Sequence, residues 1–202
     1  MDLITYQITL SPKTVEDASP AAKGLLEHTK KEVGMIPNMY ANMANAPALL
    51  STYSHGYRLL RSESGFTPAE QEVIFLTISY ENRCEYCMAA HSFVADMMSK
   101  VPIEVTEAIR NGMPIPDQKL RALSTFTSTM LNKRGNPTKE DVEMFLQAGY
   151  TEHHILYIIL ALSIKTISNY ANHIFHTPVD TVFKAREWSA YKAARKVLNF
   201  FR

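Results

Sequence analysis

Several features that would assign a chain to a particular class of protein are scarce or absent in these 202 residues. It has only two cysteines, which excludes a disulfide-stapled secreted scaffold. Its 21 basic and 20 acidic residues leave a formal net charge of +1, so no nucleic-acid surface is indicated. Clean alternation of β-branched and polar residues is absent, which argues against a sheet protein. The composition therefore predicts one helical domain, with or without an added arm, that is long enough to bury a core.

Export and membrane signals are absent as well. The first residues contain no basic region followed by an apolar core, so we expect no signal peptide. The most apolar run, residues 155–164, is shorter than the roughly 20 residues of a membrane span, and Lys165 and Asn169 then interrupt it. We therefore predict that this run forms a buried core helix. We expect a cytoplasmic protein that binds neither membrane nor nucleic acid.

Proline and Ser/Thr start signals mark a series of helices along the chain. A helix begins at Ser19-Pro20, a short one follows Pro37 and a longer one follows Pro47. Thr67 and Glu70 form a capping box at the start of the next helix. Further helices are expected over about residues 84–99, 117–132, 138–148, 151–176 and 181–200.

Both cysteines occur in one short segment, Cys84-Glu85-Tyr86-Cys87, which His91 follows. In a helix, spacings of three and four residues place Cys84, Cys87 and His91 along one stripe. Two thiols one turn apart can form a disulfide, and the imidazole can exchange a proton with the thiol above it. Glu72 lies on the preceding helix, so in a tight hairpin its carboxylate can hold the imidazole in one tautomer. The segment predicts a redox-active dithiol.

Other interpretations of these residues stay open. The cysteines can be inert core residues, since free cysteine is commonly buried. Cys84, Cys87, His91 and Glu72 can also hold zinc, although a structural zinc site more often has a second pair of ligands elsewhere. If the dithiol is reactive, the helix N-terminus favours Cys84 as the activated thiol, because the helix dipole stabilises a thiolate there.

The spacing from Glu72 through Cys84 and Cys87 to His91 resembles the E-x(11)-C-x-x-C-x-x-x-H signature of the AhpD-type alkylhydroperoxidases. That type belongs to the carboxymuconolactone decarboxylase-like superfamily. Segments 117–123, 138–142 and 147–151 are also similar to this family, and residues 169–178 are similar to its peroxidase-related branch. The resemblance divides the chain into an N-terminal arm with a first helix (1–35), an AhpD-like helical core (36–180) and a C-terminal amphipathic helix (181–202).

The resemblance implies an all-α fold with the C-x-x-C motif on a helical hairpin, and thiol peroxidase chemistry without a cofactor or metal. It assigns Cys87 as the thiol that is oxidised to sulfenic acid and Cys84 as the proton donor and resolving thiol. It assigns Glu72 and His91 as a proton relay. The implied partners are a hydroperoxide substrate and an external dithiol or a peroxiredoxin. A homo-oligomer, either a trimer or a hexamer, is also implied.

One position departs from the family pattern. AhpD has a histidine just before the second cysteine, where this chain has Tyr86. A phenol with an ordinary pKa near about 10 cannot replace an imidazole as a base at neutral pH. A decarboxylase acting on a lactone acid is the alternative enzyme, and the vicinal dithiol disfavours it.

The C-terminal segment, residues 181–202, is rich in large apolar and basic residues. We expect it to form an amphipathic helix that packs across a subunit boundary. The alternative is that this helix packs on its own subunit.

Overall fold

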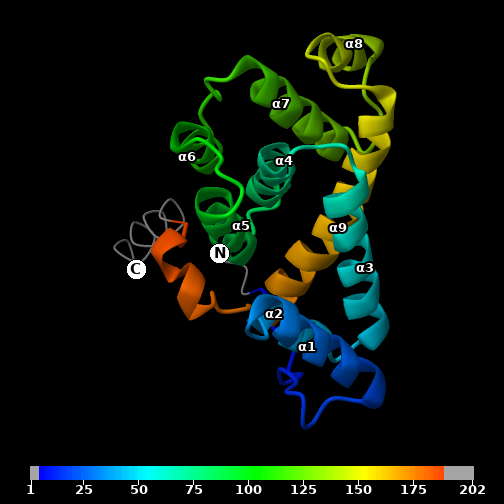
Figure 1. The fold of residues 1–202 in the computed structure, drawn as a ribbon, viewed down its shortest axis with the longest axis vertical. Helices are drawn as coiled ribbons and strands as arrows, with labels where there is room; N and C mark the ends of the chain where they lie inside the picture. Colours follow the sequence, from blue (N-terminus) through cyan, green and yellow to red (C-terminus); the bar gives the residue numbers. More distant parts are fainter. Residues whose placement is uncertain (1–4, 189–202) are drawn as a thin grey trace.

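The computed structural model describes residues 5–188, and this part of the chain contains helices and no strands. The helices are α1 (Pro20–Val33), α2 (Asn38–Met43), α3 (Pro47–Glu63), α4 (Pro68–Glu81), α5 (Glu85–Met97), α6 (Ile103–Asn111), α7 (Gln118–Asn132), α8 (Lys139–Gln147), α9 (Glu152–Phe175) and the 3-10 helix η1 (Thr181–Arg186). Figure 1 shows their arrangement, with α4 surrounded by other helices. The predicted all-α fold is confirmed.

Helix α4 forms the centre of the core and contacts α5, α6, α7 and α9. Its residues 70–79 are all buried. A helix that is surrounded on every side needs apolar side chains around its whole circumference, and α4 supplies them with Val73, Ile74 and Phe75 among others. The predicted capping box of Thr67 and Glu70 fixes the start of the helix. Because Glu72 lies in this buried part of α4, its carboxylate is completely buried.

The predicted helix that begins after Thr151 is confirmed as α9, a single helix that contacts α2, α3, α4, α5 and α7. It packs closely against α3 at Gly56, where an added Cβ would lie 2.6 Å from Ile164 Cγ2. By length and composition alone α9 could cross a membrane, which is weak evidence because buried core helices meet the same test. Its buried face carries the polar residues Lys165 and Asn169 in contact with other helices.

The connection between α4 and α5 is tight, as the hairpin prediction requires. Arg83 has a left-handed backbone with φ of 53°, an uncommon conformation for a residue with a side chain. The chain turns there, and the backbone N–H of Cys84 donates to the carbonyl of Ser79 at 2.9 Å. Cys84 is the N-cap of α5. The turn therefore places the first turn of α5 beside the last turn of α4.

The predicted amphipathic helix over residues 181–200 is wrong in its described part. Thr181–Arg186 forms a 3-10 helix, and Glu187 then has an extended backbone with φ of −53° and ψ of 140°. Residues 189–202 lie outside the described part of the chain. In this segment, Phe183 and Trp188 contact separate parts of the core.

Those contacts lie within the chain's own subunit. Phe183 packs against Tyr86 and Phe93 of α5, with ring centroids 6.4 Å and 5.5 Å apart. Trp188 is buried, and its indole N–H donates to the carbonyl of Arg110 at 2.7 Å. Through Trp188, the segment therefore packs on its own core, as the alternative for it expects. Packing across a subunit boundary stays a prediction.

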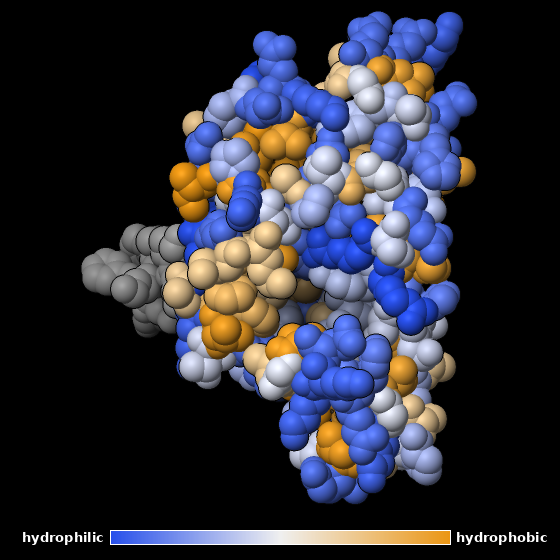
Figure 2. All heavy atoms as spheres, in the orientation of Figure 1, coloured by the Kyte–Doolittle hydropathy of each residue, from blue (hydrophilic) through white to orange (hydrophobic). Residues whose placement is uncertain are grey.

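Figure 2 shows that hydrophobic side chains gather over α5 on one face of the molecule. At the end of that helix, Met97 is 68% exposed and Met98 is 71% exposed. Exposed apolar areas of this kind commonly mark interaction surfaces. Homo-oligomeric assembly stays a prediction.

Candidate active site

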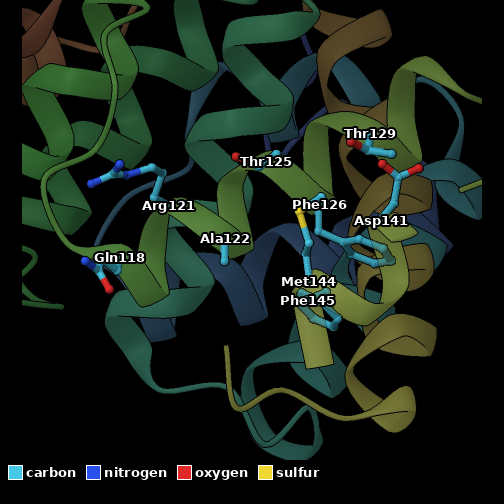
Figure 3. Close-up of a pocket in the computed structure, with 9 residues that line it drawn as sticks. All are labelled: Gln118, Arg121, Ala122, Thr125, Phe126, Thr129, Asp141, Met144 and Phe145. Carbon is cyan, nitrogen blue, oxygen red and sulfur yellow. The ribbon is translucent and has the colours of Figure 1, made fainter. Parts of the chain in front are cut away.

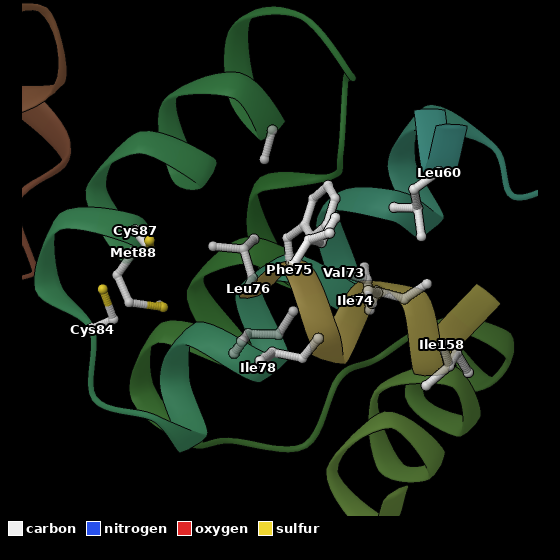
Figure 4. Close-up of a cluster of buried hydrophobic side chains, with 14 of the residues drawn as sticks. Leu60, Val73, Ile74, Phe75, Leu76, Ile78, Cys84, Cys87, Met88 and Ile158 are labelled. Atoms are coloured by element: carbon white, nitrogen blue, oxygen red, sulfur yellow. The ribbon is translucent and has the colours of Figure 1, made fainter. Parts of the chain in front are cut away.

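The two thiols lie in the first turn of α5, buried at the edge of the hydrophobic core (Figure 4). Both are free cysteines in this structure. Asn172 of α9 reaches them from the other side, with its amide nitrogen Nδ2 at 3.3 Å from Cys87 Sγ and 3.9 Å from Cys84 Sγ. An amide N–H can only donate, so both sulfurs act as acceptors. A sulfur that accepts hydrogen bonds is better suited to be a thiolate than a thiol.

Glu72 and His91 are brought together as the sequence predicts. Nδ1 of His91 lies 2.9 Å from Oε2 of Glu72, and both side chains are buried. Burial raises the pKa of Glu72, but the adjacent His91 and Arg61 outweigh burial and hold it below its usual value. An ionised carboxylate accepts the proton on Nδ1 and leaves Nε2 as the basic nitrogen of the ring. This is the tautomer required for proton exchange with a nearby thiol.

Arg61 of α3 is a member of this network that the sequence analysis missed. Its guanidinium donates to Oε1 of Glu72, to the hydroxyl of Tyr57 at 2.6 Å and to Oε1 of Gln71 at 3.0 Å. It also lies over the ring of Phe75, 4.9 Å from the centroid. The second carboxylate oxygen of Glu72 is therefore held by a permanent cation.

The charges around the thiols separate their pKa values. Burial raises the pKa of Cys87, but the hydrogen bond from Cys84 and the positive charge of Lys165 outweigh it and hold the pKa well below its usual range. Burial raises the pKa of Cys84, and its hydrogen bond to Cys87 raises it further. Cys87 is therefore favoured as the thiolate and Cys84 as the protonated thiol. This ordering agrees with the roles that the family resemblance implies, and not with the argument from the helix N-terminus.

Tyr86, the residue that departs from the family pattern, has a structural partner. Its hydroxyl donates to the carboxylate of Asp180, which also accepts the backbone N–H of Asn38 at 3.1 Å. Burial and the charge of Asp180 raise the pKa of Tyr86 well above the ordinary value. The phenol therefore stays protonated and ties the segment before η1 to α5.

Lys165 and Asn172 were also missed as site residues. They lie seven residues apart on the buried face of α9, with Ser168 and Asn169 between them. The sequence carried a signal, because Lys165 and Asn169 interrupt an otherwise apolar helix. In the sequence, this interruption argues against a membrane span. A polar stripe on a core helix also indicates a buried polar site.

The zinc interpretation gains no support from the described residues. Within residues 5–188 there is no group of three or more His, Cys, Asp or Glu side chains arranged to hold a metal ion. The carboxylate of Glu72 is engaged by Arg61 and His91. The inert-core interpretation accounts for the burial of the thiols but not for the amide donor and the charges directed at them.

A cavity of about 260 Å³ lies between α7 and α8 (Figure 3). Its lining is mainly apolar and includes Phe126, Met144 and Phe145, with Arg121 and Asp141 among its polar residues. It shares no lining residue with the dithiol or its relay. The cavity is therefore separate from the candidate active site.

The sequence model of the carboxymuconolactone decarboxylase family matches residues 47–127. Residues 47–127 belong to the carboxymuconolactone decarboxylase family. This segment runs from the start of α3 through most of α7 and contains Glu72, both cysteines and His91. The family resemblance found in the sequence is confirmed. No protein among the curated ones compared matches the chain.

Solved structures with the same fold extend the likeness beyond the family segment. The AhpD core of an uncharacterised peroxidase-related protein from Ralstonia eutropha JMP134 is 19% identical, with a TM-score of 0.75 over 86% of this chain and 93% of that one. An uncharacterised peroxidase-related protein from Silicibacter sp. TM1040 is 20% identical, with a TM-score of 0.71 over 91% and 98%. A cysteine-to-alanine variant of the debrominase Bmp8, in complex with 2,3,4-tribromopyrrole, is 16% identical, with a TM-score of 0.71 over 89% and 96%.

At these identities the neighbours show the fold alone. Together with the family match, they show an AhpD-like helical fold.

Proposed function

We propose that this protein is a cofactor-free thiol-disulfide oxidoreductase that reduces hydroperoxides, or a partner peroxiredoxin, through Cys87 and Cys84. The observation that carries the proposal is the environment of Cys87. Its sulfur accepts a hydrogen bond from Asn172, and its pKa is held low beside the Glu72–His91 pair. A decarboxylase would have no use for a thiol pair whose pKa values are separated in this way.

In the first step, the Cys87 thiolate attacks the terminal oxygen of a hydroperoxide ROOH. The O–O bond breaks, an S–O bond forms, and Cys87 is oxidised to sulfenic acid. The leaving alkoxide takes up one proton and departs as ROH. The Cys84 thiol is placed to donate that proton directly or through Nε2 of His91, since Nδ1 is committed to Glu72.

In the second step, the Cys84 thiolate attacks the sulfenic sulfur, forms the disulfide and expels hydroxide, which a proton converts to water. The balance is one hydroperoxide and two thiols giving ROH, water and a disulfide. An external dithiol then reduces the disulfide by thiol-disulfide exchange and is itself oxidised. The same exchange, run against an oxidised peroxiredoxin, would reduce that partner.

Reductive dehalogenation is a second candidate, favoured by the likeness to the debrominase Bmp8. The Cys87 thiolate would attack the bromine of a bromopyrrole, and the ring carbon would take up a proton as the C–Br bond breaks. Cys84 would then displace bromide from sulfur to give the disulfide. This route uses the same dithiol and the same proton donor as the peroxidase route.

The deciding experiment supplies the reduced protein with an alkyl hydroperoxide or a bromopyrrole, together with a panel of dithiol donors. We expect consumption of one substrate that needs both cysteines, so that Cys87→Ser abolishes turnover and Cys84→Ser prevents disulfide formation. A wild-type protein that consumes neither substrate with any donor, and that does not reduce an oxidised peroxiredoxin, would refute the proposal. Activity that survives in Cys87→Ser would refute it as well.

Assembly and location also belong to the proposal. We expect a cytoplasmic homo-oligomer, either a trimer or a hexamer, as the family resemblance implies. In the described part of the C-terminal segment, Phe183 and Trp188 contact their own subunit. Light scattering of the full-length protein tests the subunit number, and a monomer would contradict this expectation.

A further inference from the structure

Lys165 is completely buried in the middle of α9. Its ammonium nitrogen Nζ has no hydrogen-bond partner among the described residues. Burying a lysine charge without a partner costs several kcal/mol. A nearby anion would offset that cost.

Carboxylates do not supply that anion. The carboxylate of Glu72 is engaged by Arg61 and His91. Lys165 Nζ instead lies 5.7 Å over the ring of Phe75, and that ring packs against His91 at 4.7 Å between centroids. The ring of Phe75 therefore lies between the ammonium group of Lys165 and the imidazole of His91 as a shared contact.

The group that can become an anion here is the thiol. Asn172, two helical turns after Lys165 on the same face of α9, places its amide nitrogen 3.3 Å from Cys87 Sγ. The same amide nitrogen lies farther from Cys84 Sγ, at 3.9 Å. One face of α9 thus carries a buried cation, whose charge lowers the pKa of Cys87, and an amide donor that lies nearer to the sulfur of Cys87 than to that of Cys84.

We propose that Lys165 is the counter-ion of the Cys87 thiolate and that Lys165 and Asn172 of α9 hold this sulfur in its reactive form. The inference rests on the proposed function, in which Cys87 is the attacking thiolate. It adds that α9, and not the N-terminus of α5, sets the reactivity of the dithiol. It also explains why Cys84 can occupy the N-cap and remain the protonated partner.

The other groups that face Cys87 are consistent with this assignment. Cys84 donates a hydrogen bond to it, and the neighbouring His91 further lowers its pKa. Burial raises the pKa of Tyr53 and of Tyr86, so both phenols stay neutral. Lys165 is therefore the cation assigned to the thiolate, while the charge of Arg61 is matched by Glu72.

The test is the ultraviolet absorbance of the thiolate, titrated against pH in the reduced protein. Lys165→Met removes the charge and keeps an unbranched chain, and it should raise the pKa of Cys87 by about one to three units. Asn172→Ala should shift that pKa in the same direction. Lys139→Met, which removes a lysine charge from an exposed site on α8, is the matched control and should leave the pKa unchanged. A Cys84→Ser background assigns the titration to Cys87.

A second measurement does not depend on activity or on the absolute pKa. Oxidation to the disulfide removes the thiolate and leaves Lys165 without its anion. Lys165→Met should therefore stabilise the oxidised protein against urea relative to the reduced protein. If Lys165→Met does not fold, Lys165→Gln serves in both measurements with the same expected directions.

An unchanged Cys87 pKa in both Lys165 variants would overturn the ion pair, even if the enzyme turned over normally. A raised pKa in a protein that consumes neither hydroperoxide nor bromopyrrole, and that does not reduce an oxidised peroxiredoxin, would refute the proposed function and leave the ion pair in place.

Discussion

Replacing Glu72 with glutamine tests the relay at its most constrained point. The carboxylate accepts from Arg61 on one oxygen and from His91 Nδ1 on the other. A glutamine side chain has one acceptor oxygen and one donor amide in the same places. If its oxygen faces Arg61, its amide faces Nδ1, and the imidazole must place its proton on Nε2. The nitrogen that should exchange protons with the thiols then loses its basic lone pair.

The expected loss of turnover is about 10²–10⁴-fold, the usual contribution of a positioned general base. The expected loss of stability is smaller. Breaking a buried ion pair can cost about 3–5 kcal/mol when the remaining charge stays buried and unpaired. The side chain of Arg61 is 22% exposed and keeps Tyr57 and Gln71, so about 1–3 kcal/mol is the better expectation.

The assay compares turnover and urea unfolding of Glu72→Gln with those of Glu70→Gln. Glu70 is a buried carboxylate on the same helix that pairs with Lys119 and caps α4 at Thr67, away from the thiols. The control should lose stability and keep its turnover, so a loss of turnover confined to Glu72→Gln isolates the relay. Wild-type turnover in a folded Glu72→Gln protein would show that the thiols react without this relay.

Three further predictions follow from the same contacts. Mild peroxide treatment should remove two alkylation sites together, as Cys84 and Cys87 form a disulfide, and mass spectrometry that finds both thiols alkylated would contradict this. The pKa of His91 is lowered by burial and by Lys165, so the unfolded chain binds more protons below about pH 6.5. The free energy of unfolding should therefore fall as pH drops from about 7 to 5, and urea titrations of His91→Gln should show a shallower fall, whereas a wild-type slope would refute the assignment. Gly56→Ala should destabilise the protein by up to about 2 kcal/mol, because overpacking against Ile164 of α9 outweighs the gain in helix propensity. The control is Gly24→Ala, which has nothing within 4 Å of its added Cβ and should stabilise the protein slightly. Equal unfolding midpoints for the two variants would contradict the close packing of α3 on α9.

The sequence predicted the helices well where local chemistry decides them. The capping box at Thr67 and the helix starts at Pro20 and Pro47 lie where the residue patterns placed them. These signals depend on a few neighbouring residues, so they survive any tertiary arrangement. The prediction of an α-helix failed over residues 181–188 because an apolar pattern does not distinguish an α-helix from a short 3-10 helix and an irregular segment whose aromatic residues fill separate sites. Phe183 and Trp188 fill such sites on α5 and α6.

The candidate site was predictable where it lies within one hairpin. Glu72, Cys84, Cys87 and His91 are fixed by helical spacing and one tight turn. Arg61, Lys165 and Asn172 come from α3 and α9, which reach the hairpin only through the tertiary fold. Lys165 was visible as a charge in an apolar helix, but its sequence position does not reveal that it faces a thiol.

The buried charges also bear on how easily the disulfide would be reduced. Arg61 and Glu72 form a pair that persists in both redox states. The pair of Lys165 with Cys87 exists only while Cys87 is a thiolate, because a disulfide carries no charge. Oxidation therefore leaves an ammonium alone in a buried site, which disfavours the disulfide relative to the dithiol. A dithiol whose reduced form is stabilised in this way belongs to the readily reduced, catalytic class of disulfides and not to the structural class. An enzyme that must be returned to its dithiol form by an external donor after every turnover requires a disulfide of that kind.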